Sequence, residues 1–202
     1  NFISFLLVNG SSVTAIQNGK SIDPSIGYGT LSGVMMGTRP GDFDPAVILS
    51  LINEVGMSME EINHLLYKNS GLTGISGLSN DMRDLSAAAE KGSSRAKLAL
   101  ELYADKVKKY IGAYSVSLKQ VNAIIFTAGI GENNYEAREM ICDGLECLGA
   151  YLDKEKNISR GETKIVSTED SPVKIIVIPT DEELMIAQET KKLIPTNKET
   201  NK

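Results

Sequence analysis

Phe126-Thr127-Ala128-Gly129-Ile130-Gly131-Glu132-Asn133-Asn134 is the stretch that decides the fold, because it joins an apolar run to an amphipathic segment. The apolar run, 121–125, is typical of a buried strand, and the amphipathic segment, 135–148, carries apolar residues at helical spacing. The stretch is therefore predicted to be a strand-to-helix turn. Gly129 and Gly131 lack a Cβ, which lets the main chain approach a flat or anionic ligand closely. A glycine pair is equally typical of a tight turn without a ligand. Evidence from other parts of the chain is therefore needed to decide whether this turn binds a ligand.

The composition is that of a globular protein with one large core and small-molecule partners. The chain has 202 residues, of which 42% are hydrophobic and 23% are charged. Its formal net charge of −5 argues against a general nucleic-acid or membrane-surface role, although it leaves room for a local basic pocket that binds an anion. No stretch approaches the roughly 20 apolar residues that span a bilayer, and the first residues lack a signal-peptide pattern. A cytoplasmic protein is therefore expected.

The start of the chain predicts a fragment. The sequence begins at Asn1 without a methionine and continues at once into the apolar run 2–8, which is typical of a core strand. A core strand needs neighbours on both of its edges. A preceding part of the protein is therefore expected.

The first residues also predict a three-stranded antiparallel meander. Three apolar or alternating runs are separated by Asn-Gly pairs at 9–10 and 18–19, and such a pair between two runs is the strongest local signal for a hairpin. The runs are 2–8, 13–17 and 20–22. The second pair is a plain turn. The first pair is followed by Ser11 and Ser12, and this polar tip suits a phosphate contact as well as a plain turn.

Beyond the meander, glycine-rich loops alternate with helices and further strands. The segment 23–45 is predicted to be a long ordered loop that carries Arg39, and 68–84 is predicted to be a second such loop. Capping residues and helical spacing predict helices that begin near Asp44, Ser58, Ser94, Tyr135 and Thr180. The last buried strand is expected at 173–178, and Thr180 is the predicted cap of the helix that follows it.

The order of these elements predicts an α/β fold. Three meander strands are followed by helices, a strand, a helix, a strand and a helix. That order is typical of a ribonuclease-H-like half-domain, the unit that is doubled in the actin-like and sugar-kinase-like phosphotransferases. The expected sheet is mixed, with the three-strand meander beside parallel strands and with helices on both faces.

Several loop motifs together resemble the C-terminal portion of the acetate kinase family. The matching segments are Asn9-Gly10-Ser11-Ser12, Gly33-Val34-Met35-Met36-Gly37-Thr38-Arg39, Gly41-Asp42-Phe43-Asp44-Pro45, Ser70-Gly71-Leu72, Gly74-Ile75-Ser76-Gly77, Asp81-Met82-Arg83, Phe126-Thr127-Ala128-Gly129-Ile130-Gly131-Glu132-Asn133 and Ile178-Pro179-Thr180-Asp181-Glu182-Glu183-Leu184. They keep one order and span nearly the whole chain, which makes the resemblance far more specific than a glycine pair. It implies that residues 1–194 are the C-terminal nucleotide-binding domain and that the N-terminal half is absent. The polar composition of 195–202, rich in Lys, Thr, Asn and Glu, predicts a disordered tail.

The resemblance implies ATP-dependent, reversible phosphorylation of acetate to acetyl phosphate and ADP, with Mg²⁺ or Mn²⁺ as the metal. It implies that Arg39 is catalytic, since in-line phosphoryl transfer needs a fixed positive charge against the transferred group. Without the resemblance, a loop arginine paired with Asp42 or Asp44 is the simpler interpretation. Glu182 resembles the carboxylate that holds Mg²⁺ through its water shell, although the helix dipole alone also favours an acid at that position.

The resemblance also implies a nucleotide site in two parts. The phosphates are expected at the polar tip of the first hairpin, at Asn9, Gly10 and Ser11. The base and ribose are expected between two loops, which contribute Asp81, Met82 and Arg83 on one side and Gly129, Ile130, Gly131 and Asn133 on the other. Asp81 suits a ribose hydroxyl as an acceptor, but Asp81 and Arg83 suit a pair with each other equally well.

Two departures from the family's pattern bear on activity. The family's first strand ends in His-Leu-Gly, whereas this chain has Leu6-Leu7-Val8, so weaker phosphate binding is expected. The N-terminal half, which carries a phosphate loop and catalytic side chains of its own, is missing from the sequence. The chain alone is therefore expected to be inactive.

Two alternatives to acetate phosphorylation remain open. The first is a propionate or butyrate kinase, because the acyl pocket of the resembling family lies partly in the missing half. The second is a non-catalytic dimerisation module, because that family forms homodimers through this domain with helices such as 94–114. The expected partners are acetate and ATP as substrates and a second copy of the chain, with no nucleic acid and no membrane.

Overall fold

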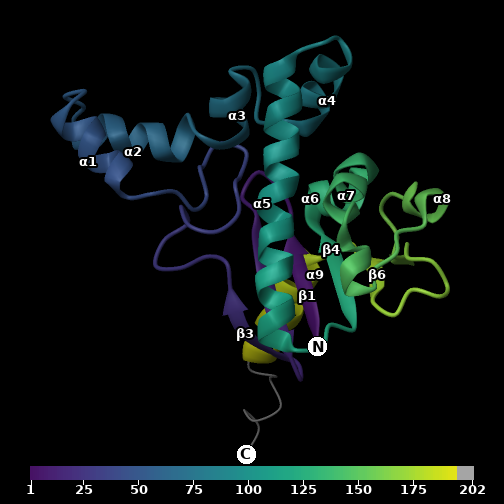
Figure 1. The fold of residues 1–202 in the computed structure, drawn as a ribbon. Coiled ribbons are helices and arrows are strands. Elements are labelled where there is room, and N and C mark those ends of the chain that lie inside the picture. The colour runs from purple at the N-terminus through teal and green to yellow at the C-terminus, as the bar shows by residue number, and fades with distance from the viewer. Residues whose placement is uncertain (195–202) are drawn as a thin grey trace, which may run out of the picture.

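The computed structural model describes residues 1–194, and these contain a six-stranded mixed sheet (Figure 1). The strands are β1 (Phe2–Leu6), β2 (Ser12–Gln17), β3 (Lys20–Pro24), β4 (Ala123–Thr127), β5 (Lys164–Ile165) and β6 (Lys174–Val177). Their order across the sheet is β3-β2-β1-β4-β6-β5. The meander β1–β3 is antiparallel, β4 is parallel to both β1 and β6, and β5 is antiparallel to β6. The predicted mixed sheet with its three-strand meander is therefore confirmed.

The helices connect and cover the strands. Within residues 1–194 they are α1 (Ala46–Asn53), α2 (Met59–Lys68), α3 (Gly71–Ser76), α4 (Met82–Glu90), α5 (Ser94–Leu118), α6 (Ala128–Asn133), α7 (Tyr135–Cys142), the 3₁₀ helix η1 (Leu145–Leu148), α8 (Lys154–Asn157) and α9 (Glu182–Leu193). None of them is both long and apolar enough to cross a membrane. The predicted disordered tail, 195–202, lies outside the described residues.

One face of the sheet is covered over its four central strands and forms the core. In β1, β2, β4 and β6, alternate residues on this face are completely buried, as the two-residue alternation of a strand predicts, whereas all residues of the edge strand β3 are exposed. These residues are Ile3, Phe5, Val13, Ala15, Ile124, Phe126, Ile175 and Val177. The long helix α5 crosses this face and buries Tyr103, Val107 and Ile111 from its inner side (Figure 1). The sheet and α5 therefore pack together into one buried layer.

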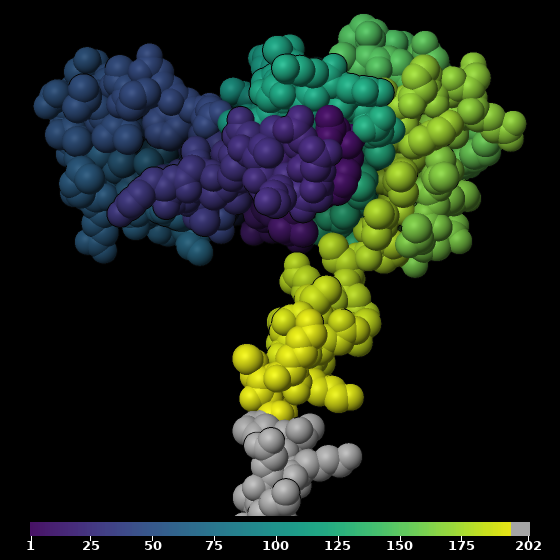
Figure 2. All heavy atoms as spheres, turned by 90° about the horizontal axis from the view of Figure 1, so that it is seen from below, coloured from purple at the N-terminus to yellow at the C-terminus, as the bar shows by residue number. Residues whose placement is uncertain are grey.

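The opposite face of the sheet is only partly covered. Strand residues that alternate with the core positions, such as Ser4 and Ile125, are partly exposed. α9 lies on this side, and Figure 2 shows it standing out from the body instead of packing along the strands. None of its residues is buried. Helices therefore lie on both sides of the sheet, as predicted, but only one face is sealed.

The start of α9 differs from the prediction in its cap. Asp181, not Thr180, is the N-cap, and its side chain accepts a hydrogen bond of 2.9 Å from the Leu184 N–H. Thr180 instead donates its N–H and its hydroxyl to Glu132 Oε1, at 2.8 and 3.0 Å. Because Glu132 belongs to the turn after β4, these two bonds tie the start of α9 to that turn.

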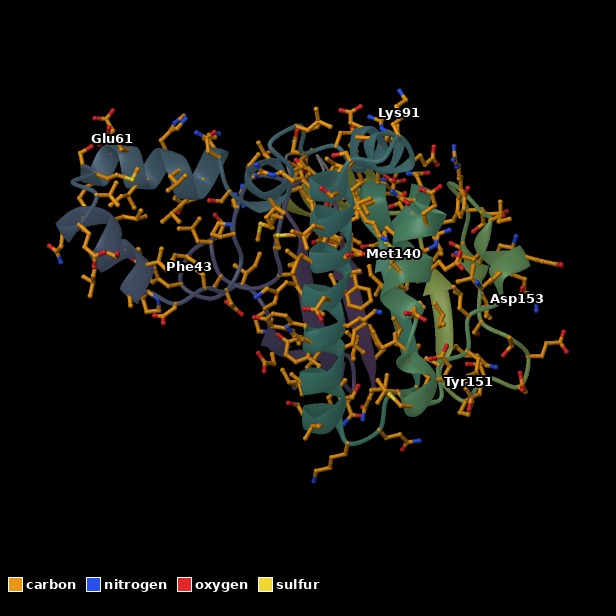
Figure 3. The ribbon with its side chains drawn as sticks, turned by 45° about the horizontal axis from the view of Figure 1, so that its top comes forward. Phe43, Glu61, Lys91, Met140, Tyr151 and Asp153 are labelled. Carbon is orange, nitrogen blue, oxygen red and sulfur yellow. The ribbon has the colours of Figure 1, made fainter. Side chains whose placement is uncertain are left out.

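α1 and α2 form an arm that stands off from the sheet (Figures 1 and 2). α2 begins with a complete capping box between Ser58 and Glu61, as predicted. Figure 3 shows Glu61 on the outer side of the arm and Phe43 near its base. α1 is largely apolar, yet it buries none of its residues. The arm therefore presents an apolar helix that the rest of residues 1–194 does not cover.

Candidate functional site

A pocket of about 650 Å³ opens between the turn that follows β4 and the start of α4. Its size lies within the range of small-molecule sites. The pocket brings together seven of the predicted nucleotide-binding residues, namely Asn9, Asp81, Met82, Arg83, Gly129, Ile130 and Asn133. Segments that are far apart in the sequence, from the first hairpin, from α4 and from the turn after β4, therefore face one cavity.

The turn after β4 forms one wall of this pocket, and Leu7, directly after β1, holds its backbone. Ala128 takes a left-handed conformation with a φ of 62°, which turns the chain sharply from β4 into α6. The N–H groups of Ile130 and Gly131 both donate to the Leu7 carbonyl, at 2.8 and 3.3 Å. Because these amides already have a partner, they are not available to a phosphate. This part of the wall therefore offers its surface, and not the Ile130 and Gly131 amide groups, to a ligand.

The opposite wall is the start of α4, where Asp81 and Arg83 are paired. The Asp81 side chain caps the helix by accepting from the Arg83 N–H at 2.9 Å, and it also binds the Arg83 guanidinium through Nε and Nη2. This pairing is the alternative that the sequence left open. The guanidinium holds the pKa of Asp81 below its usual range, so the carboxylate is ionised at neutral pH. The ion pair between Asp81 Oδ2 and Arg83 Nη2 is open to solvent on the arginine side, and an exposed pair of this kind contributes little to stability.

The tip of the first hairpin is held by the glycine-rich loop 33–41. The Asn9 carbonyl accepts from the Gly37 N–H at 3.0 Å, and Asn9 Oδ1 accepts from Asn80 Nδ2 at 2.8 Å. A Cβ on Gly37 would lie 1.9 Å from Asn9 Oδ1, so this close approach requires glycine. Asn9 therefore links the hairpin tip, the loop 33–41 and the α4 wall of the pocket.

Ser11 has a structural role that the sequence did not indicate. Its hydroxyl is completely buried, donates to the Val8 carbonyl at 2.8 Å and lies 3.0 Å from the Tyr103 hydroxyl. Burial raises the pKa of Tyr103 to about 12, so the tyrosine keeps its proton at neutral pH. The Ser11 side chain thus fixes the hairpin tip to α5, and any contact of Ser11 with a phosphate would have to involve its main chain.

Arg39 lies beside the hairpin tip without an acidic partner among residues 1–194. A Cβ built on Gly10 would lie 3.6 Å from Arg39 Nη1, which places the guanidinium next to that glycine. The contacts of Nη1 are long ones, to the Thr30 carbonyl at 3.4 Å and to Met36 Sδ at 3.7 Å. The positive charge of Arg39 is therefore not compensated within the described chain.

The acidic residues of the same loop have other partners. Asp42 Oδ1 accepts from the Gly33 N–H at 2.8 Å, and Asp42 Oδ2 accepts from the Tyr110 hydroxyl. Asp44 Oδ1 accepts from the Ala46 N–H at 2.8 Å, at the start of α1. The interpretation of Arg39 as a loop arginine paired with Asp42 or Asp44 is therefore wrong.

Besides Gly10, Ser11 and Arg39 at the hairpin tip, two further predicted site residues do not line the pocket. Gly131 packs against β4, since a Cβ on it would lie 3.3 Å from the Phe126 carbonyl carbon. Glu182 is exposed at the first position of α9. Within residues 1–194, no three His, Cys, Asp or Glu side chains gather as a metal cluster. A single carboxylate still fits Mg²⁺, because this ion keeps several waters and binds through one or two carboxylates and the phosphates of its substrate.

Sequence reasoning missed part of the pocket lining. These residues are Val8, Asn80, Ser86, Asn134, Tyr135, Glu136 and Arg160. Tyr135 and Glu136 directly follow the quoted turn, so their place in the sequence was a usable signal. Arg160 lies in the loop after α8 and belongs to no motif, so only the folded chain reveals it.

Known proteins resemble this chain in sequence and in fold. A model of the acetokinase family matches residues 1–188. The chain belongs to the acetokinase family. The acetate kinase of Clostridium novyi (strain NT) is 51% identical over 191 residues, which are 95% of this chain and 48% of that protein. The acetate kinase of Dictyoglomus thermophilum is 53% identical over 192 residues, again 95% of this chain and 48% of the relative. The chain therefore spans about half the length of the curated acetokinase relatives it matches.

Solved acetokinase-family structures have the same fold. The crystal structure of Porphyromonas gingivalis acetate kinase matches with a TM-score of 0.92 and 41% identity, over 96% of this chain and 49% of that one. The crystal structure of a propionate kinase from Francisella tularensis subsp. tularensis SCHU S4 matches with a TM-score of 0.90 and 44% identity, over 96% and 50%. The predicted fold class and the resemblance to the acetate kinase family are both confirmed.

Proposed function

We propose that this chain is the C-terminal, nucleotide-binding half of an acetate kinase, which reversibly transfers a phosphoryl group from ATP to acetate. The observation that carries the proposal is the placement of Arg39. An uncompensated guanidinium lies beside Gly10, at the hairpin tip whose Asn9 also lines the 650 Å³ pocket. In-line phosphoryl transfer needs a fixed cation and a binding site for the nucleotide, and these two features supply both.

Different residues of the site are proposed to hold the base and ribose, the phosphates, the transferred group and the metal. The wall at Ile130 and the α4 wall at Met82 would hold the base and ribose. Asn9 and Gly10 would lie along the phosphates, and Arg39 would face the group that is transferred. Bound Mg·ATP supplies the phosphoryl group, and Glu182 is the residue proposed to hold the metal through water. A reaction that consumes ATP requires a compartment that provides it, which makes the cytoplasm the proposed location.

The acyl substrate is proposed to be acetate, with propionate or butyrate as the alternative. The named acetate kinase relatives favour acetate. The Francisella propionate kinase has nearly the same TM-score as the acetate kinase from Porphyromonas gingivalis, so the fold does not discriminate between the two acids. Acyl-chain length must therefore be measured.

The function is tested by restoring the half that the relatives possess. Fusing this chain behind the N-terminal half of Clostridium novyi acetate kinase is expected to give acetyl phosphate from ATP and acetate in a coupled assay. The chain alone is expected to bind Mg·ADP weakly and to form no acetyl phosphate, because Arg39 acts with groups that lie in the other half. Turnover by the chain alone, or a fusion that folds but uses none of acetate, propionate and butyrate, would contradict the proposal.

We also propose that the chain forms a homodimer, and the arm is the surface that supports this. Leu49 and Val55, in and just after α1, are 61% and 65% exposed, and an apolar helix without a cover is typical of an interface. The outer face of α5, which the sequence favoured, carries instead the charged pairs Lys97–Glu101 and Lys109–Asp105. Charged pairs of this kind are favourable on a surface that faces solvent. The arm therefore replaces α5 as the proposed contact.

Sedimentation at several concentrations tests the dimer. Leu49→Asp is expected to raise the dissociation constant about tenfold or more, because a charge would be buried in the interface. Leu98→Asp on α5 is the matched control, since Leu98 is a 47% exposed leucine on the other candidate surface. A chain that is monomeric at every concentration, or a dimer that only Leu98→Asp weakens, would refute the arm as the contact.

A further inference from the structure

Arg138 is a completely buried arginine directly behind the pocket wall. It is the fourth residue of α7, which directly follows the 126–134 stretch, and none of its surface is exposed. Its Nε donates to Asn157 Oδ1 at 2.8 Å, and its Nη1 donates to the Gly131 and Glu132 carbonyls at 2.8 and 2.9 Å. Its Nη2 donates to the Asn157 and Ser159 carbonyls, at 2.5 and 3.2 Å. All five N–H groups of the side chain are thus used.

These contacts involve no carboxylate. Arg138 takes part in no salt bridge within residues 1–194, and every acceptor is a carbonyl or amide oxygen. Burial lowers the pKa of Arg138 to about 10, so the side chain still carries its charge at neutral pH. A buried cation without an anion is costly, and an apolar side chain of similar volume would avoid that cost. The arrangement therefore indicates that the planar guanidinium, with its five N–H donors, has a role that an apolar side chain could not fill.

The fork connects two segments that line the pocket. On one side it holds the Gly131 and Glu132 carbonyls in the turn after β4, a turn whose Ile130 and Gly131 amides are bound to Leu7, directly after β1. On the other side it holds Asn157 and Ser159, which lie three residues and one residue before the pocket residue Arg160. Asn157 closes the link by donating its Nδ2 to the Tyr135 carbonyl at 2.9 Å. One side chain thus sets the spacing between the turn and the loop that carries Arg160.

We propose that Arg138 is a positioning residue for nucleotide binding, which clamps the Gly129–Asn133 turn from behind and places the Arg160 loop against it. The inference rests on the proposed function, since it assumes that the pocket takes a nucleotide. Arg138 touches no ligand. Its effect reaches the nucleotide through the turn and through Arg160.

Loss of the clamp is expected to loosen both segments at once. Arg138→Lys keeps the charge but replaces a planar fork by a single ammonium, which cannot reach the two sets of carbonyls together. Arg138→Met removes the charge and leaves the carbonyls of Gly131 and Ser159 without their donor. Displacement of supporting groups by about 1 Å is enough to lower affinity or rate by one to two orders of magnitude.

The experiment measures Mg·ADP binding to this chain by calorimetry and amide exchange by mass spectrometry. Arg138→Lys is expected to raise the dissociation constant roughly tenfold and to speed exchange in 129–134 and 157–160, with exchange in the β1–β4 ladder unchanged. Saturating ADP is expected to restore part of the protection in 129–134. Asn157→Ala, which removes one acceptor and the bond to Tyr135, is a milder second variant and is expected to raise the constant about threefold.

Two controls separate the possible failures. Ser171→Ala removes a buried hydroxyl that binds the Gly149 and Val173 carbonyls, far from the pocket, so it reports loss of stability alone and is expected to leave ADP binding unchanged. Ser86→Trp fills the pocket from the exposed side of α4 and is expected to abolish binding. If Ser86→Trp leaves binding intact, the nucleotide pocket is wrong and the inference fails with it. If Ser86→Trp abolishes binding while Arg138→Lys and Asn157→Ala bind like the unchanged chain, the positioning role alone is overturned.

Discussion

Replacing Arg39 by alanine is expected to lower kcat of the fused kinase about 10³-fold, with little change in the KM for acetate. The guanidinium lies beside Gly10 and has no acidic partner within residues 1–194, so its charge is available to a transferred phosphoryl group. A group that stabilises the transition state more than the bound substrates changes kcat and not KM. The measurement is steady-state acetyl phosphate formation by the fusion with the N-terminal half of the Clostridium novyi enzyme.

Arg95→Ala is the matched control for this experiment. Arg95 is an arginine that binds main-chain carbonyls away from the hairpin tip, since its Nε and Nη2 donate to the Ile75 and Gly74 carbonyls of α3 at 2.8 and 3.1 Å. Its loss is expected to change kcat by less than about threefold. Arg39→Lys should recover only part of the rate, because an ammonium does not reproduce the planar fork. A decrease below tenfold for Arg39→Ala would mean that Arg39 only supports its own loop.

The sheet could be predicted from the sequence because its signals are local. Alternation in 13–17, the Asn-Gly pair at 18–19 and the apolar run before Phe126 each specify structure within a few residues. The strands β1–β4 and β6 lie where these signals placed them. The cap of α9 was predicted wrongly because Thr180 satisfies the local rule equally well, yet the distant Glu132 takes both of its donors.

The candidate site was predictable only where a motif marks it. Asp81 and Gly129 belong to motifs of the resembling family, and both line the pocket. Ser11 belongs to such a motif too, but its hydroxyl binds Tyr103, which is 92 residues away. No motif in the sequence indicates that Tyr103 is its partner. Arg160 and Arg138 depend in the same way on contacts between distant segments. Long-range contacts of this kind follow from packing, which no local pattern contains.

Gly71→Ala is expected to lower the free energy of unfolding of this chain by about 2–4 kcal/mol, the sum of backbone strain and overpacking. Gly71 has a φ of 60°, and a Cβ on it would lie 2.1 Å from the Met36 carbonyl oxygen and 2.6 Å from the Arg39 carbonyl oxygen. The Leu72 N–H donates to the same Met36 carbonyl at 3.0 Å. The 33–41 loop therefore cannot move away from Gly71 without losing that hydrogen bond. Urea unfolding followed by circular dichroism measures the loss.

Gly56→Ala separates the two causes of that loss. Gly56 has a similar φ of 78°, but nothing lies within 4 Å of the position that its Cβ would occupy, so only the strain of about 1 kcal/mol is expected. The clash at Gly71 involves the backbone of both Met36 and Arg39. In the fused kinase, Gly71→Ala should therefore also reduce kcat, by about 10²-fold, whereas Gly56→Ala should not. Equal losses of stability in the two variants would show that the 33–41 loop adapts to the extra atom. The close packing of Gly71 would then have no part in holding Arg39 beside Gly10.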